Sequence, residues 1–319
     1  MDEFTLEPME RTQSKLSVAV YAPSGAGKTT AALKMAMGIR DQLYPGEKLS
    51  DIGLFIDTER RSSTKAVGRS IGGEVLEPLE LYVFEPPYDI NKLARLVTWA
   101  VTVKNKKIII VDSYSAFWSG VDGILERAAE IDVQLGQQKK MYGAWSEKEI
   151  ISKKNILKNL MTNTQAHMIF CFRAKTEYVI ETNARGKAVP RAIGVKEDMQ
   201  GDVRYEFDVV MSLDKETHEC TVVKDRIGYL EIRETSKSPE APVTIGDGAL
   251  LAKLVSEGLT LEEIAQRKKN HYIDFILDEK LHKNSKVTQL ENSKNIEFSK
   301  ETLTKFDYET LTKIVKFIK

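Results

Sequence analysis

The chain has 319 residues and a mass of 36.0 kDa, which is enough for one large hydrophobic core and a smaller second unit. Hydrophobic residues make up 42% and charged residues 29% of the sequence, a composition that excludes a disordered or fibrous protein. The 47 basic and 47 acidic side chains cancel, so any nucleic-acid binding must depend on a local basic strip rather than on net charge.

The two cysteines, Cys171 and Cys220, are too few for a disulfide framework, and their spacing with the four histidines matches no zinc site. The first 15 residues are acidic and lack the apolar stretch of a secretion signal. No window approaches the roughly 18 uninterrupted apolar residues of a membrane-spanning helix. We therefore expect a cytoplasmic protein with no membrane partner.

After a polar N-terminal arm over residues 1–15, the sequence alternates short apolar runs with helical patterns. Strand-like apolar runs lie at residues 16–21, 52–57, 81–84 and 106–112, and helical patterns cover residues 29–43 and 91–103. Buried strands that alternate with helices are typical of a parallel sheet covered on both faces.

Beyond residue 112 the segment up to residue 145 is loop-rich, and a helix in residues 147–165 and a strand in residues 167–174 follow. Short β-branched runs at residues 176–182, 205–213 and 219–225 are separated by polar turns and predict hairpin strands. The sequence therefore predicts an α/β fold, with a mostly parallel sheet, helices on both faces and an antiparallel hairpin extension.

Pro, Gly and Ser accumulate in residues 236–248, and the pattern after them is helical. Thr260 and Glu263 form a capping box, and an apolar face on the last helix contains Leu311, Ile314, Val315 and Ile318. We predict an arm over residues 1–15, a core over residues 16–240 and a small helical module over residues 248–319. The module either docks DNA or protein, or simply stabilises the fold.

The segment between the first strand and the first helix matches the Walker A phosphate-binding pattern, except that alanine replaces the first glycine. It comprises Ala22, Pro23, Ser24, Gly25, Ala26, Gly27, Lys28 and Thr29, and Thr30 follows. The glycines let backbone N–H groups point at phosphates, Lys28 neutralises the β and γ oxygens, and the Thr29 hydroxyl can ligate Mg²⁺. A chance glycine turn is the alternative, but the flanking strand and helix favour an ATP site.

Asp112 ends the apolar run IIIVD, where a Walker B carboxylate would face Mg²⁺ beside the phosphate loop. The alternative is an ordinary acidic strand end. Ser113, not a glutamate, follows Asp112, so the group that activates water must lie elsewhere. Glu59, at the mouth of the second strand, is the best candidate, although it could equally be a charge at a helix N-terminus.

The segments FIDTE, ending at Glu59, and IIIVDSYSAFW, containing Asp112, resemble the RecA and recombinase family of P-loop ATPases. This resemblance implies that Glu59 is the catalytic carboxylate and Asp112 the magnesium-side aspartate. Lys224 and Arg226 resemble the lysine and arginine finger that RecA-like oligomers insert into a neighbour's site; the alternative is a solvated basic turn. Arg173 stands where these enzymes carry a polar sensor, unless it is a surface charge.

The layout of residues 15–235 is similar to phage nucleotide-binding ATPases that act as single-strand annealing or recombination proteins. The resemblance implies ATP and Mg²⁺ as cofactors, self-assembly into a ring or filament, and the cytoplasm of a bacterial host. It also implies single-stranded DNA and a single-strand-binding or replication protein as partners. Ala22 and the helical C-terminal segment depart from that family's pattern.

A basic segment with Gly and Pro offers a candidate DNA site, with Arg185, Lys187, Arg191 and Lys196 placed to contact phosphates. A second candidate set, in the preceding loop-rich segment, comprises Lys139, Lys140, Tyr142 and Trp145. A solvated basic loop and a packed tryptophan are the alternatives.

Three functions follow from these patterns. The leading hypothesis is an oligomeric ATPase that acts on single-stranded DNA in recombination, annealing or replication. The second is a RecA-like ATPase that loads or regulates a protein partner through its helical module. The third, a small-molecule kinase, shares the phosphate loop but requires an arginine-rich lid and an acceptor pocket.

Overall fold

A computed structural model describes residues 9–135, 143–182, 188–199, 203–236 and 240–318. The chain divides into a sheet unit, Ser14–Ser256, and a helical unit made of Met1–Gln13 and Glu257–Lys319. Each unit has its own hydrophobic core. No helix in the described ranges is long and apolar enough to cross a membrane.

The sheet unit is built on a central, mostly parallel sheet with the strand order β10-β9-β1-β7-β6-β2-β5. The strands are β1 (Ser17–Ala22), β2 (Gly53–Asp57), β5 (Glu80–Val83), β6 (Ile108–Asp112), β7 (His167–Thr182), β9 (Val209–Leu213) and β10 (Cys220–Asp225). Only β10 runs antiparallel to its neighbour in this path. Every residue of β1, β2 and β6 is buried, because helices cover both faces of the sheet.

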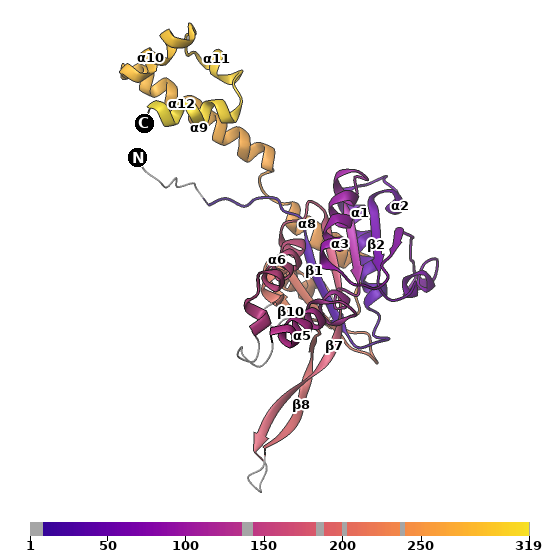
Figure 1. Cartoon of the computed structure of the whole chain (residues 1–319). Coiled ribbons are helices and arrows are strands. Elements are labelled where there is room, and N and C mark those ends of the chain that lie inside the picture. The colour runs from indigo at the N-terminus through magenta and orange to yellow at the C-terminus, as the bar shows by residue number, and fades with distance from the viewer. Residues whose placement is uncertain (1–8, 136–142, 183–187, 200–202, 237–239, 319) are drawn as a thin grey trace. The chain divides into compact units, whose positions relative to one another are not determined.

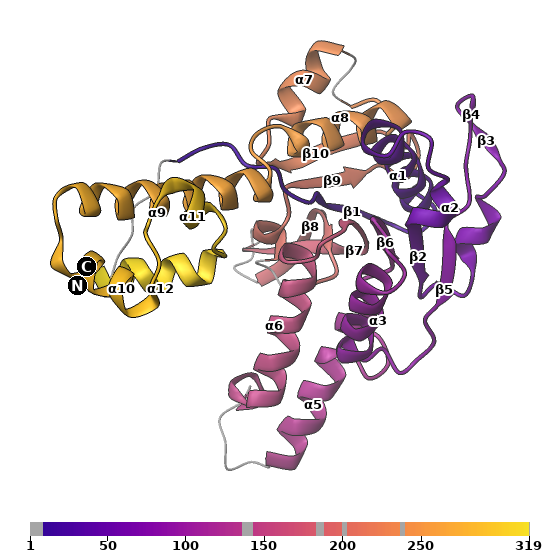
Figure 2. The same cartoon turned by 90° about the horizontal axis from the view of Figure 1, so that it is seen from above.

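Figure 2 shows the two helical layers. Helices α1 (Lys28–Leu43) and α8 (Ile245–Ser256) cover the face to which Val18 and Val20 contribute. Helices α3 (Ile90–Thr102), α5 (Ile124–Leu135) and α6 (Lys148–Thr162) cover the face of Ala19 and Tyr21. The alternation of side chains along β1 thus supplies both cores. The predicted α/β fold class is confirmed.

Strand β7 is longer than the sequence indicated. Two strands were expected at residues 167–174 and 176–182, but β7 is continuous and its second half leaves the sheet to pair antiparallel with β8 (Ala188–Glu197). Arg173 is the last β7 residue paired with β1, and Ala174 is the first paired with β8. The two strands extend beyond the sheet as an arm (Figure 1).

Helix α8 belongs to the sheet unit, although the sequence suggested a helical module from residue 248. It packs against α1 at two glycines, because a Cβ at Gly38 would meet the Ile245 carbonyl oxygen and a Cβ at Gly248 would meet the Met35 backbone. Buried Arg233 and Asp247 also pair across 3.2 Å. Residues 240–244 therefore lead into α8, the last helix of the sheet unit, and the two glycines of the stretch lie in that helix.

The helical unit consists of α9 (Leu261–Leu281), α10 (Ser285–Lys294), α11 (Lys300–Thr304) and α12 (Tyr308–Ile318). The predicted capping box is confirmed, since Glu263 N–H donates to Thr260 Oγ1 at 3.0 Å and Thr260 N–H to Glu263 Oε2 at 2.8 Å. The predicted apolar face of α12 is buried. Thr12 forms an isolated β-bridge with Leu259, so the segment that precedes the sheet unit pairs with the segment that follows it.

The remaining elements are short connections. They are α2 (Leu49–Ile52), η1 (Ser62–Lys65), β3 (Ser70–Ile71), β4 (Glu74–Val75), α4 (Ala116–Ser119), η3 (Gly143–Ser146), η4 (Val203–Glu206) and α7 (Tyr229–Ser236).

Candidate functional site

The Walker A segment forms the turn from β1 into α1. Gly25 and Gly27 have φ of 86° and 87°, a conformation that favours glycine. Ala22 lies buried at the end of β1 with an extended backbone, so the alanine that replaces the first glycine of the pattern causes no strain. The loop thus has the backbone that the phosphate-binding mechanism requires.

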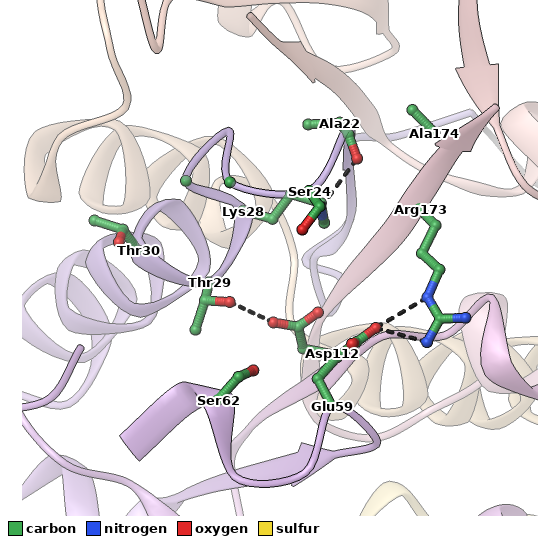
Figure 3. A pocket seen from close by; sticks show the side chains of 12 residues that line it. Ala22, Ser24, Lys28, Thr29, Thr30, Glu59, Ser62, Asp112, Arg173 and Ala174 are labelled. Atoms are coloured by element: carbon green, nitrogen blue, oxygen red, sulfur yellow. Dashed lines mark hydrogen bonds and ion pairs between the residues drawn. The ribbon is translucent and has the colours of Figure 1, made fainter. Parts of the chain in front are cut away.

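Two side chains of this segment have defined partners (Figure 3). Lys28 Nζ donates to the carbonyl oxygens of Ala22 and Pro23, both at 3.0 Å. The Thr29 hydroxyl donates to Asp112 Oδ2 at 2.6 Å. The lysine therefore folds over its own loop, and the threonine connects α1 to the end of β6.

Strand β7 separates β1 from β6, so Asp112 reaches Thr29 across one intervening strand. Burial raises the pKa of Asp112 to about 6, although the Thr29 hydrogen bond and the Lys28 charge oppose this shift. A hydroxyl and a carboxylate are oxygen ligands of the kind that Mg²⁺ prefers, and Mg²⁺ sites on nucleotides often use one or two protein ligands. Thr29 and Asp112 therefore fit a magnesium ion.

Glu59 lies at the same edge of the sheet and pairs with Arg173 of β7. Arg173 Nε and Nη2 donate to the same oxygen, Glu59 Oε1, at 2.9 and 2.8 Å. The Arg173 N–H donates to Ser115 Oγ at 3.0 Å, which positions the arginine. The sequence placed both residues in this region but predicted no pair.

A cavity of about 530 Å³ brings these groups together. Its lining comprises Ala22, Ser24, Gly25, Gly27, Lys28, Thr29, Thr30, Glu59, Ser62, Asp112, Arg173 and Ala174. The volume suits a nucleotide-sized ligand.

The sequence interpretation missed three residues that lie at or beside this cavity, namely Asp57, Ser62 and His218. Asp57 is fully buried and accepts from the Glu59 N–H at 2.7 Å and from the Ser63 N–H at 3.2 Å, and the Ser63 hydroxyl also donates to it. It therefore fixes the turn that carries Glu59. Ser62 lines the cavity, and His218 Nδ1 would lie 3.7 Å from a Cβ at Gly27. An aspartate that ends an apolar run two residues before Glu59 was the available signal for Asp57.

Lys224 and Arg226 do not line this cavity. Lys224 Nζ donates to the carbonyl oxygens of Arg204, Tyr205 and Phe207 at 2.8, 2.9 and 2.6 Å. Arg226 Nη2 also donates to the Tyr205 carbonyl oxygen. In this state both side chains therefore hold η4 against the end of β10.

The candidate DNA residues fall into two groups. Arg191 and Lys196 lie on β8, opposite Val179 and Lys175 of β7. Arg185, Lys187, Lys139, Lys140 and Tyr142 lie outside the described residues. Trp145 packs near Trp118, with ring centroids 5.9 Å apart, which favours its packing role.

Residues 14–239 match the family model described as an AAA domain. The chain belongs to the AAA domain family. This membership supports a RecA-like P-loop ATPase core that uses a nucleotide and, as a rule, Mg²⁺. The resemblance to phage recombinases stays a prediction.

Among solved structures, the AAA domain protein is similar to a KaiC-like protein from the archaeon Pyrococcus horikoshii OT3, with 13% sequence identity and a TM-score of 0.34. The match covers 66% of this chain and 79% of the archaeal one. A likeness of this size carries no functional argument. No curated protein matches the sequence.

Proposed function

We propose that the chain is a Mg²⁺-dependent ATPase that acts on single-stranded DNA in recombination, annealing or replication. The observation that carries the ATPase part is the convergence of Lys28, Thr29, Asp112 and Glu59 on one cavity. These residues come from α1, the end of β6 and the turn after β2, and each supplies a different group that hydrolysis needs.

In the proposed mechanism, Lys28 exchanges its contacts with the loop carbonyls for the β and γ phosphate oxygens. Thr29 and Asp112 would hold Mg²⁺, which supplies charge stabilisation for the phosphates. Glu59 accepts a proton from the attacking water. At the same time the water oxygen bonds to the γ phosphorus, and the bond between the γ phosphorus and the β–γ bridging oxygen breaks. Arg173 holds Glu59 before the reaction and can then turn its charge toward the γ phosphate.

Self-assembly into a ring or filament belongs to the same proposal. Because Lys224 and Arg226 lie away from their own cavity, they would act on the cavity of a neighbouring copy. Lys224 would first have to release three carbonyl oxygens, so we expect assembly to rearrange η4.

The DNA part of the proposal draws on the arm formed by β7 and β8. Arg191 and Lys196 lie on β8, and Arg185 and Lys187 fall in the connection between the two strands. A basic, projecting ribbon suits contacts to phosphates without base specificity. A single-strand-binding or replication protein remains the proposed additional partner.

The test is steady-state release of phosphate with and without Mg²⁺ and single-stranded DNA, over a range of protein concentrations. Wild type should hydrolyse ATP faster with DNA and at higher protein concentration, and Lys28→Ala should be inactive. Hydrolysis that depends on Lys28 but ignores DNA would favour the protein-directed ATPase. Transfer of phosphate to a metabolite would favour the kinase.

A further inference from the structure

Arg60 and Arg61 directly follow Glu59, and both have left-handed backbones, with φ of 54° and 63°. Two consecutive non-glycine residues in this conformation are uncommon and costly, so the surrounding contacts must impose the turn. Buried Asp57 does so, by accepting from the Glu59 N–H and from Ser63 on either side of the two arginines. The turn exposes both arginine side chains.

Neither guanidinium has a carboxylate partner among the residues that the structure describes. Arg173, which lines the nucleotide cavity, is by contrast paired with Glu59 at 2.8 Å. Two exposed, unneutralised arginines held by one fixed turn form a local positive charge on a chain whose net charge is zero.

These arginines line a second cavity, of about 490 Å³, that is separate from the nucleotide cavity. The rest of the lining comprises Thr58, residues 83–86 and Tyr88. Glu85 is the single acid of the described lining, so positive charge dominates.

We infer that this cavity, which we call the Arg60/Arg61 site, binds a phosphodiester of single-stranded nucleic acid. A guanidinium presents paired donors that match two phosphate oxygens, and the half-buried Tyr88 ring offers a surface on which a base can stack. An acidic peptide would bind through charge alone and would not use the aromatic ring, so the ring favours a nucleic acid as the ligand. The inference rests on the proposed action on DNA but names a site away from the arm.

The site also suggests how DNA binding could affect the ATPase site. Glu59 is adjacent in sequence to Arg60, and the Tyr88 hydroxyl donates to the Thr58 carbonyl oxygen at 3.3 Å. A DNA strand that binds Arg60 and stacks on Tyr88 would therefore contact the neighbour of Glu59 in the sequence and the residue that is hydrogen-bonded to Thr58. If bound DNA loosens the Asp57 contacts that hold this turn, Glu59 would shift relative to Arg173, which would couple DNA binding to the position of the proposed base.

The test is fluorescence anisotropy of a labelled oligo(dT), titrated with the full chain at several salt concentrations, with and without a slowly hydrolysed ATP analogue. Removal of two phosphate contacts in Arg60→Ala/Arg61→Ala should weaken binding about tenfold and reduce the slope of log K against log salt by about 1.4. Arg60→Lys/Arg61→Lys should recover most of the affinity because it keeps the charges. The matched control is Lys65→Ala/Arg69→Ala, which removes two exposed cations of the same connection that do not line the cavity.

The outcomes separate this inference from the proposed function. If Arg60→Ala/Arg61→Ala binds oligo(dT) with wild-type affinity and slope, the Arg60/Arg61 site is wrong while DNA binding stands, and Arg191→Ala/Lys196→Ala then tests the arm. If wild type binds no oligo(dT) under any condition, the proposed action on DNA and this inference are both overturned. A double alanine variant that loses only poly-glutamate binding would assign the site to an acidic protein instead.

Discussion

Arg173 and Glu59 are joined by two hydrogen bonds to one carboxylate oxygen, at 2.9 and 2.8 Å, although 113 residues of chain separate them. The side chains are 47% and 35% exposed, so water screens the pair. Its contribution to stability should therefore be about 1 kcal/mol or less. A double-mutant cycle with Glu59→Gln and Arg173→Ala in urea denaturation measures this coupling. A coupling energy of several kcal/mol would mean that the pair is too strong to open during turnover.

Glu59→Gln should retain nucleotide binding and lose about 100-fold or more in the rate of hydrolysis, because the amide cannot accept the proton of the attacking water. Phosphate release and the binding of a fluorescent ATP analogue measure the two properties separately. Glu262→Gln, which changes an exposed glutamate in the first turn of α9, is the matched control and should behave as wild type. Undiminished hydrolysis in Glu59→Gln would place the base elsewhere.

Asp112→Asn should stabilise the fold above pH 6 and abolish Mg²⁺-dependent activity. Burial raises the pKa of Asp112 from 3.8 to about 6, so between these values the folded state holds a proton that the unfolded state has lost. Stability therefore falls as pH rises toward 6, by about 3 kcal/mol at most, and Asn avoids this loss while still accepting from Thr29. Urea denaturation at pH 5 and pH 8 measures the difference, with exposed Asp274→Asn as the control.

Mg²⁺ affinity should fall as the pH drops below about 6, because protonated Asp112 is a poor ligand and metal binding must displace its proton. Titration of the ATP-bound chain with Mg²⁺ at several pH values checks this. An affinity that does not vary between pH 5 and pH 8 would argue against Asp112 as a ligand.

Gly38→Ala and Gly248→Ala should each destabilise the sheet unit by about 1–3 kcal/mol, because the new methyl group would collide with the backbone of the facing helix. Gly246→Ala, also in α8, meets only the Thr244 hydroxyl at 3.5 Å, an ordinary contact. It should be neutral or slightly stabilising, since alanine favours helix. Thermal or urea denaturation distinguishes the three variants, and equal effects would contradict the close approach of α1 and α8.

A chain that ends at Ser256 should fold and bind nucleotide, whereas one that ends at Glu240 should not fold stably. The shorter chain loses α8 and leaves Arg233 buried without Asp247, a change that costs about 3–5 kcal/mol. Circular dichroism and nucleotide binding compare the two truncations. Equal stability would show that α8 is dispensable and would favour the boundary predicted from the sequence.

The sequence sufficed for features whose physical cause is local. The phosphate loop needs glycines at positions 25 and 27 and a lysine at the start of a helix, and the buried strands need continuous apolar runs, so both are visible in a short window. The capping box at Thr260 is local in the same sense.

Other features depend on contacts between distant segments and have no local pattern. The pairing of Glu59 with Arg173 follows from the sheet order, in which β7 lies between β1 and β6. The place of α8 depends on two helices that approach at Gly38 and Gly248, and neither glycine signals this in its own neighbourhood. The continuity of β7 was hidden because a lysine, a threonine and a glutamate interrupt its apolar run.

The continuity of β7 has a mechanical consequence. A loop would let the arm swing, but no loop separates the part of β7 inside the sheet from the part that pairs with β8. The arm is therefore a continuous extension of the central sheet, and Arg173, the last β7 residue paired with β1, lies where the arm leaves the sheet. A partner that pulls on the arm would transmit force directly to Ala174 and Arg173, which line the nucleotide cavity, and through Arg173 to Glu59.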